Sequence, residues 1–119
     1  MEKLIGVVGP CAAGKTTLVA NLRRLGYRAK HIAQEHSYVP YMWQKITQPD
    51  ILIFLEVSYE NTLLRRKLSW SRDEYNEQLI RLVHARQHAD LVIDTNLLDT
   101  QGVLQNVETF MIEKGFRNP

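Results

Sequence analysis

The stretch Gly9-Pro10-Cys11-Ala12-Ala13-Gly14-Lys15-Thr16 decides how this chain folds. It matches the pattern G-x-x-x-x-G-K-[ST], and it lies between an apolar run at residues 4–8 and a segment with helical periodicity. Gly9 and Gly14 let the backbone turn so that successive N–H groups point inward, and the start of the following helix adds a partial positive charge. A strand, this loop and a helix in that order predict a phosphate-binding loop.

A nucleoside triphosphate with Mg²⁺ is the natural ligand of such a loop. Lys15 is placed to reach the β- and γ-phosphate oxygens, and the Thr16 hydroxyl is placed to complete the Mg²⁺ coordination shell. ATP is the expected triphosphate, although the pattern does not separate it from other triphosphates. The loop residues expected to contact the nucleotide are Gly9, Pro10, Cys11, Ala12, Ala13, Gly14, Lys15, Thr16 and Thr17.

The composition limits the size and the class of the protein. The 119 residues are 45% hydrophobic and 24% charged, which suffices for one small core, and we expect a single nucleotide-binding domain over residues 1–119. The net charge of +2 is too small to favour nucleic acid as a partner. Cys11 is the single cysteine, which excludes an internal disulfide, and no apolar run approaches the roughly 20 residues that span a bilayer. These features predict a cytoplasmic protein without a membrane partner.

Strand and helix patterns alternate along the chain. Strands are expected at residues 4–8, 28–33, 51–55 and 91–93. Helices are expected after the loop up to Gly26, at residues 40–47, from Ser58 to about Leu68, at residues 71–89, and from Asp99 to Gly115. Such alternation predicts an α/β fold with a parallel sheet, in which ligands bind beyond the carboxyl ends of the strands.

Two further runs accompany the loop, Pro49-Asp50-Ile51-Leu52-Ile53-Phe54-Leu55-Glu56-Val57-Ser58 and Ala89-Asp90-Leu91-Val92-Ile93-Asp94-Thr95. With all three in view, the chain resembles a shortened member of the P-loop NTPases of the nucleoside and nucleotide kinase-like family, which includes adenylate, thymidylate and shikimate-type kinases. The resemblance spans most of the chain. It implies a three-layer P-loop NTPase fold, with a small parallel sheet of about four strands in the order 2-1-3-4 flanked by helices.

The resemblance also implies roles for residues outside the loop. In this family an arginine about ten residues past the final leucine of the apolar strand contacts the transferring phosphate, and Arg65 stands at that position. The adenine is held near the loop after the last strand, which here consists of Thr95, Asn96 and Leu97. We therefore expect Arg65 to be catalytic and the other three residues to bind nucleotide.

The chain departs from the family pattern in two places. Family members usually carry a substrate-binding insertion after the first helix, and only residues 27–48 are available for it here. A second lid arginine is also absent from its usual position, where Ser69 and Trp70 stand, and Arg72 is the nearest replacement. These departures concern the phosphoryl acceptor and the lid.

Phosphoryl transfer needs an acidic group at a strand end, either to hold Mg²⁺ through water or to orient the attacking oxygen. Glu35 and Glu56 compete for this role. Glu56 ends the most apolar strand, whereas Glu35 faces Thr16 if the strand at residues 28–33 lies directly beside the first strand. Strand order and the switch-point rule favour Glu35 as a catalytic residue and Mg²⁺ ligand. For either residue, the alternative is a solvated carboxylate at a strand end.

Several other side chains have both a functional and a structural interpretation. His36 and Ser37 are candidates for contact with the acceptor because they follow Glu35. Tyr38, Tyr41 and Trp43 either form a stacking wall for a base or sugar or belong to the core. Arg81 and Arg86 are either lid residues or part of a solvated helix face. His84 and His88 have the i, i+4 spacing of a helical metal pair, but no further ligand accompanies them. Trp70 either covers the nucleotide or packs at a helix junction.

The leading hypothesis is a Mg-ATP-dependent phosphotransferase that acts on a small-molecule hydroxyl or phosphate, with Lys15, Glu35 and Arg65 as its catalytic residues. The alternative is a nucleotide-binding or nucleotide-hydrolysing regulatory module without such an acceptor. A guanine-specific switch is disfavoured because the sequence has no N-K-x-D motif. A further alternative is a homo-oligomer whose acceptor site is completed at a subunit interface.

Overall fold

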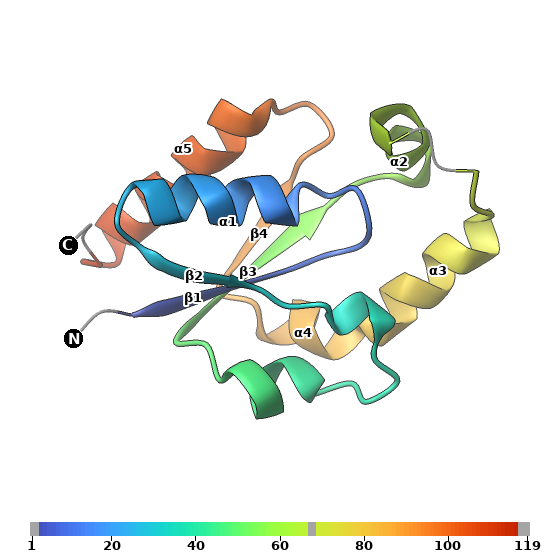
Figure 1. Ribbon diagram of the computed structural model, residues 1–119, viewed down its shortest axis with the longest axis horizontal. Helices are drawn as coiled ribbons and strands as arrows, with labels where there is room; N and C mark the ends of the chain where they lie inside the picture. The colour runs from blue at the N-terminus through green and yellow to red at the C-terminus, as the bar shows by residue number, and fades with distance from the viewer. Residues whose placement is uncertain (1–2, 67–68, 117–119) are drawn as a thin grey trace.

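Four parallel strands form the sheet of the computed structural model, which describes residues 3–66 and 69–116 (Figure 1). The strands are β1 (Leu4–Val8), β2 (Arg28–His31), β3 (Ile51–Glu56) and β4 (Leu91–Asp94). Their order across the sheet is β2-β1-β3-β4, with every neighbouring pair parallel. The predicted order 2-1-3-4 is therefore confirmed, and β2 lies directly beside β1.

Helices follow the strands as the alternation predicts. The α-helices are α1 (Lys15–Arg24), α2 (Tyr59–Arg66), α3 (Arg72–Arg81), α4 (Val83–His88) and α5 (Thr100–Glu113), and two short turns are the 3₁₀ turn η1 (Gln34–His36) and the π-helical turn η2 (Trp43–Thr47). Ser71 and Glu74 form the predicted capping box of α3, and the Asp99 carboxylate caps α5. The predicted end of the helix after Ser58, at Leu68, lies outside the described residues.

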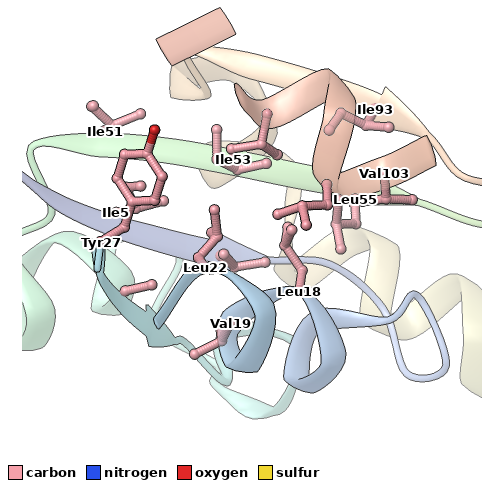
Figure 2. Packing of buried hydrophobic residues seen from close by; sticks show 14 of the residues in the cluster. Ile5, Leu18, Val19, Leu22, Tyr27, Ile51, Ile53, Leu55, Ile93 and Val103 are labelled. Atoms are coloured by element: carbon pink, nitrogen blue, oxygen red, sulfur yellow. The ribbon is translucent and has the colours of Figure 1, made fainter. Parts of the chain in front are cut away.

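The sheet separates two apolar layers because successive side chains of a strand point to opposite faces. Ile53 and Leu55 of β3 face α1 and α5 and pack with Leu22 of α1 and Val103 of α5 (Figure 2). Leu52 and Phe54 belong to the other layer, which also contains Val8, Ile32, Trp43, Leu82 and Ala85. Figure 1 shows α1 and α5 on one side of the sheet and α4 on the other. The fold is thus three layers, as expected.

Two aspartates fix the register at the amino ends of β3 and β4. The Asp50 carboxylate accepts a hydrogen bond of 2.7 Å from the Leu4 N–H, and the Asp50 N–H donates to the Leu4 carbonyl at 2.9 Å. Asp90 repeats the arrangement on the next strand, with 2.8 Å for each bond to the Leu52 N–H and carbonyl. Since all four strands are parallel, their carboxyl ends lie at one edge of the sheet, where the loop between β1 and α1 begins.

The structure corrects three sequence-based boundaries. The helix predicted at residues 71–89 is two helices, α3 and α4, separated at Leu82, whose side chain is fully buried against the second apolar layer. The helix predicted at residues 40–47 is the shorter π-helical turn Trp43–Thr47, which begins where the Trp43 N–H donates to the side chain of Gln34 at 2.8 Å. The strand predicted at residues 28–33 ends at His31.

The helices carry no sign of a membrane span: across residues 3–66 and 69–116, none is both long and apolar enough to cross a bilayer.

Candidate functional site

The loop between β1 and α1 adopts a strained, tightly packed conformation. Gly9 has φ +155°, and a Cβ there would lie 2.5 Å from the Leu55 carbonyl oxygen, so only glycine fits. Gly14 has φ +97° and caps α1 without a side-chain hydrogen bond, which leaves the helix start open to an anion. Ala12 has φ +66°, a left-handed conformation that costs a non-glycine residue about 1 kcal/mol or more. Strain of this kind is typical of a ligand-binding turn.

Lys15 is folded back across this loop and is only 6% exposed. Its Nζ donates to the carbonyl oxygens of Gly9 at 2.6 Å and Pro10 at 3.0 Å. The same nitrogen lies 3.0 Å from Oε2 of Glu35, whose side chain is 4% exposed. The ammonium therefore has three oxygen partners and is held between the loop and the end of the β2 segment.

Glu35 is positioned by the 3₁₀ turn that follows β2. Its Oε2 pairs with Lys15, and the His36 Nε2 lies 3.8 Å from the same oxygen. Its other oxygen, Oε1, is buried and has no hydrogen-bond partner within the described part of the chain. Arg81 of α3 donates to the Glu35 carbonyl at 3.2 Å and so ties this turn to the α3 helix. A buried carboxylate oxygen without a partner is a strong acceptor for a ligand or an ion.

Glu56 has different surroundings. Its Oε1 accepts hydrogen bonds from Arg86 of α4, at 3.0 Å from Nε and 2.5 Å from Nη2, and its side chain is 35% exposed. It lines a cavity of about 470 Å³ between β3 and the α3–α4 pair, together with Pro10 and Asn96. The structure thus places the two candidate carboxylates in separate cavities.

A cavity of about 850 Å³ opens over the loop between β1 and α1 and is lined by three groups of residues. The loop and α1 contribute Cys11, Ala12, Ala13, Gly14, Lys15, Thr16, Thr17 and Leu18. The side toward β2 contributes His31, Glu35 and His36, and the opposite side contributes Arg65, Arg66, Thr95, Leu98, Asp99, Thr100 and Val103. Gly9 and Pro10 do not line this cavity, and their carbonyl oxygens hold Lys15 instead.

Arg65 reaches from α2 to the loop. Its Nη1 donates to the Ala12 carbonyl at 3.2 Å and to the Thr95 hydroxyl at 3.0 Å, while Nη2 donates to the Thr95 carbonyl at 2.5 Å. Thr95 is buried, and its hydroxyl donates in turn to the Glu56 carbonyl at 2.7 Å. The structure therefore brings Arg65, Thr95 and the loop together.

The other two residues of the predicted adenine loop lie elsewhere. The Asn96 side-chain oxygen accepts hydrogen bonds of 2.8 Å from both the Ser58 N–H and the Asn61 amide, and Asn96 lines the cavity beside Glu56. Leu97 is 98% exposed and lines neither cavity. Binding of adenine by Asn96 and Leu97 stays a prediction, and in this conformation only Thr95 of the three lines the loop cavity.

Burial lowers the pKa of His31 from its ordinary value of 6.5, and the Lys15 ammonium lowers it further. The Glu35 carboxylate opposes this shift, and His36 adds a smaller lowering effect. The pKa of His31 therefore depends on the charged groups that line the β2 side of the cavity.

Gln78 is a site residue that the sequence analysis does not find. It is buried on α3; its Oε1 accepts from the Cys11 N–H at 3.0 Å and its Nε2 donates to the Cys11 Sγ at 3.2 Å. The sequence does contain a pattern that predicts burial of Gln78, since Tyr75, Gln78 and Leu82 follow the i, i+3, i+7 spacing of a buried helix face. A polar side chain at the centre of such a face needs a polar partner, and here the partner is the phosphate loop.

The aromatic residues after Glu35 do not line the loop cavity. Trp43 is buried in the core and donates through Nε1 to His84 Nδ1 at 3.1 Å, whereas Tyr38 and Tyr41 are exposed. The rings of His84 and His88 are stacked with 4.2 Å between centroids. Trp70 packs at the junction before α3, where its Nε1 donates to the Thr62 hydroxyl at 3.0 Å. In this conformation Trp43, His84 and Trp70 make contacts within the fold, and a functional role for the aromatic residues stays a prediction.

The sheet order, the loop after β1 and the helices on both faces together define the α/β fold of the P-loop kinases. Among solved structures, the chain is similar to shikimate kinase from Acinetobacter baumannii in complex with shikimate, with a TM-score of 0.64 and 16% sequence identity. The match covers 98% of this chain and 97% of that one, and at this identity it shows the fold alone. No protein-family model and no curated protein sequence matches the chain.

Proposed function

We propose that this chain, as a single nucleotide-binding domain over residues 1–119, is a Mg-ATP-dependent phosphotransferase that moves the γ-phosphoryl group of ATP to a small-molecule hydroxyl or phosphate. One observation carries the proposal: the buried Glu35 carboxylate lies 3.0 Å from the Lys15 ammonium, beside an uncapped helix start, within a fold of the P-loop kinase type. Phosphoryl transfer requires these groups, a cationic cradle for phosphates and an acidic group beside it.

The residues present fit a Mg²⁺ ion. Mg²⁺ prefers oxygen ligands, and the buried Oε1 of Glu35 lacks a partner within the described residues, while the Thr16 side chain is exposed at the first turn of α1. Thr16 and Glu35, the latter directly or through water, would hold the ion. When bound, Mg²⁺ neutralises charge on the phosphate oxygens.

The chain's own residues would then position the reactants. Lys15 and the N–H groups at the start of α1 would hold the β- and γ-phosphates. The acceptor oxygen attacks the γ-phosphorus, the bond to the bridging oxygen breaks, and ADP leaves with that electron pair. For a hydroxyl acceptor, Glu35 would take the proton. Arg65 would stabilise the charge on the transferred group from the opposite side of the cavity.

The cavity suggests which side each substrate takes. His31, Glu35 and His36 form the wall near β2, and we assign the acceptor to this side because it adjoins the proposed base. Thr95, with Leu98 and Asp99 beyond it, forms the wall on the opposite side, where the family resemblance places the adenine.

A nucleotide-binding or nucleotide-hydrolysing regulatory module is the alternative, and one observation favours it. The segment between β2 and β3 contains only the short turns η1 and η2, and its exposed aromatic residues Tyr38 and Tyr41 do not line the cavity. The acceptor wall is therefore small.

The test is an incubation of the protein with Mg-ATP, alone and with pooled nucleosides, nucleotides and small metabolites that include shikimate. ADP and phosphorylated products are followed by mass spectrometry. We expect ADP formation that depends on one pool and saturates with its active member, and we expect Lys15→Ala to abolish it. Binding of ATP without a product from any pool would contradict the transferase and favour the regulatory module.

A further inference from the structure

We propose that Cys11, Glu35 and His36 form a binding site for a thiophilic divalent cation such as Zn²⁺ at the phosphate loop. A sulfur, a carboxylate oxygen and an imidazole nitrogen from these three residues all lie within 4.8 Å of one another. Cys11 comes from the loop itself, and the other two residues come from the 3₁₀ turn after β2. Two segments that are distant in sequence thus bring three different metal-binding groups to one point.

The chemistry of this donor set selects the ion. Thiolate sulfur and imidazole nitrogen are preferred by Zn²⁺ and Co²⁺, whereas Mg²⁺ prefers oxygen alone. Three protein ligands also leave the fourth position of a tetrahedral ion open to water. The site is therefore distinct in its specificity from the proposed Mg²⁺ site, even though both use Glu35.

A second observation supports a ligand at the Glu35 carboxylate. Glu35 is 3% exposed, and its Oε1 is buried without a hydrogen-bond partner in the described residues. Leaving a buried carboxylate oxygen without a partner is costly, and a cation would satisfy it. Gln78 already fixes the loop at Cys11, with its Nε2 donating to the Cys11 Sγ at 3.2 Å.

The movements required to bind an ion are small. Ligand atoms around a tetrahedral zinc stand about 3.5 Å apart, as follows from its bond lengths. The His36 side chain is 61% exposed, and its Nε2 already lies 3.8 Å from Oε2 of Glu35. The three ligand atoms, which lie within 4.8 Å of one another, therefore need to approach by little more than about 1 Å. Binding releases the thiol proton to the buffer.

The consequence for the site is inhibition, and this step rests on the proposed function. The Glu35 carboxylate lies 3.0 Å from the Lys15 ammonium, within the proposed phosphotransfer site. A thiophilic cation bound there would take the carboxylate that Mg²⁺ and the acceptor need. Zn²⁺ and Mg-ATP would therefore exclude each other.

Co²⁺ is the probe for this site, because a cobalt–thiolate bond gives a charge-transfer band in the near ultraviolet. The reduced protein is titrated with Co²⁺ and then with Zn²⁺, which should displace it. Cys11 is the only cysteine, so the band can arise from this site alone. We expect Cys11→Ser to remove the band and His36→Gln or Glu35→Gln to weaken Co²⁺ binding at least tenfold.

His88→Gln is the matched control, since it also removes one histidine that lies outside the loop cavity, and it should leave Co²⁺ binding unchanged. Circular dichroism checks that each variant is folded. Absence of the band at millimolar Co²⁺ would overturn the proposal. A band of the same strength and affinity in folded His36→Gln and Glu35→Gln would also overturn it, because the thiol would then bind without the other two ligands.

Addition of Mg-ATP to the cobalt-loaded protein separates this proposal from the proposed function. Loss of the band in step with nucleotide binding supports both. A band that persists while Mg-ATP binds overturns mutual exclusion. A band in a protein that binds no Mg-ATP supports the metal site and overturns the phosphotransferase.

Discussion

Glu35 follows β2 and Glu56 ends β3, two strands of the same sheet with β1 between them, yet their surroundings are opposite. Glu35 is buried with Lys15 and retains one oxygen without a partner among the described residues, whereas Glu56 is partly exposed and bound by Arg86. Glu56 ends the longest and most apolar strand, and Glu35 follows a four-residue strand. An apolar strand therefore indicates that both faces of the sheet are covered there, but it does not indicate which strand end places a carboxylate beside Lys15.

The alternation of side chains along β3 explains why Glu56 is directed away from the loop cavity. Leu52 and Phe54 pack in the layer under α4, and Glu56 continues the same face two residues later. It therefore meets Arg86 of α4. The chain after β2, in contrast, forms a turn whose carboxylate meets Lys15 of the loop. Because side chains alternate between the two faces of the sheet, the position of Glu56 along β3 determines which layer its carboxylate joins.

The largest expected difference between the two carboxylates is in how much folding stability is lost when the cationic partner of each is removed. Removing one partner of a buried ion pair leaves an uncompensated charge, so Lys15→Met should lower the free energy of unfolding by about 3 kcal/mol. Arg86→Met should lower it by less than about 1 kcal/mol, because its pair with Glu56 is at the surface. Urea unfolding followed by circular dichroism measures both.

A double variant tests the cause of the stability loss. Lys15→Met with Glu35→Gln removes both charges, and we expect it to recover most of the stability that the single Lys15→Met variant loses. If the single and double variants were equally unstable, the loss would come from the Lys15 hydrogen bonds to Gly9 and Pro10 and not from the ion pair.

Much of the fold could be predicted from the sequence because its signals are local. The loop motif, the capping box at Ser71 and Glu74, and the cap at Asp99 each depend on residues a few positions apart. The strand order was implied by the family resemblance, which depends on the loop motif and the two apolar runs that begin at Pro49 and Ala89. The observed hydrogen bonds of Asp50 and Asp90 show why those strands have a common register.

The candidate site was less predictable because its contacts join distant segments. Gln78 meets Cys11 across 67 residues, and Arg81 meets the Glu35 carbonyl across 46. No local pattern gives such pairings. The helix predicted between β2 and β3 also begins later than expected, because the buried Gln34 side chain, and not a local helix signal, fixes the start of η2 at Trp43. Tertiary contacts overrode local propensity there.

The second expected difference is in activity. Glu35→Gln keeps the size of the side chain but removes its charge, and we expect it to slow phosphoryl transfer about 100-fold or more, as loss of a general base does. Glu56→Gln should change the rate less than about threefold, because Arg86 and not the substrate contacts that carboxylate. Initial rates under saturating Mg-ATP measure both. Equal losses in the two variants would contradict the choice of Glu35.

The smallest expected effect is on the pKa of His31. This pKa depends on the charges of Lys15 and Glu35, so it can be measured without any substrate. Burial and the Lys15 ammonium hold this pKa below 6.5, and Glu35 opposes them. NMR titration should therefore show a higher pKa for His31 in Lys15→Met and a lower one in Glu35→Gln, whereas Glu56→Gln should leave it unchanged.

Because the pKa of His31 is lower in the folded chain than in the unfolded chain, the unfolded chain takes up the proton first as the pH falls. His31 should thus cost no stability above its unfolded pKa, and its cost should grow as the pH falls from there through the folded pKa. A His31 pKa that did not respond to Lys15→Met would show that the two groups do not meet in solution as they do in this structure.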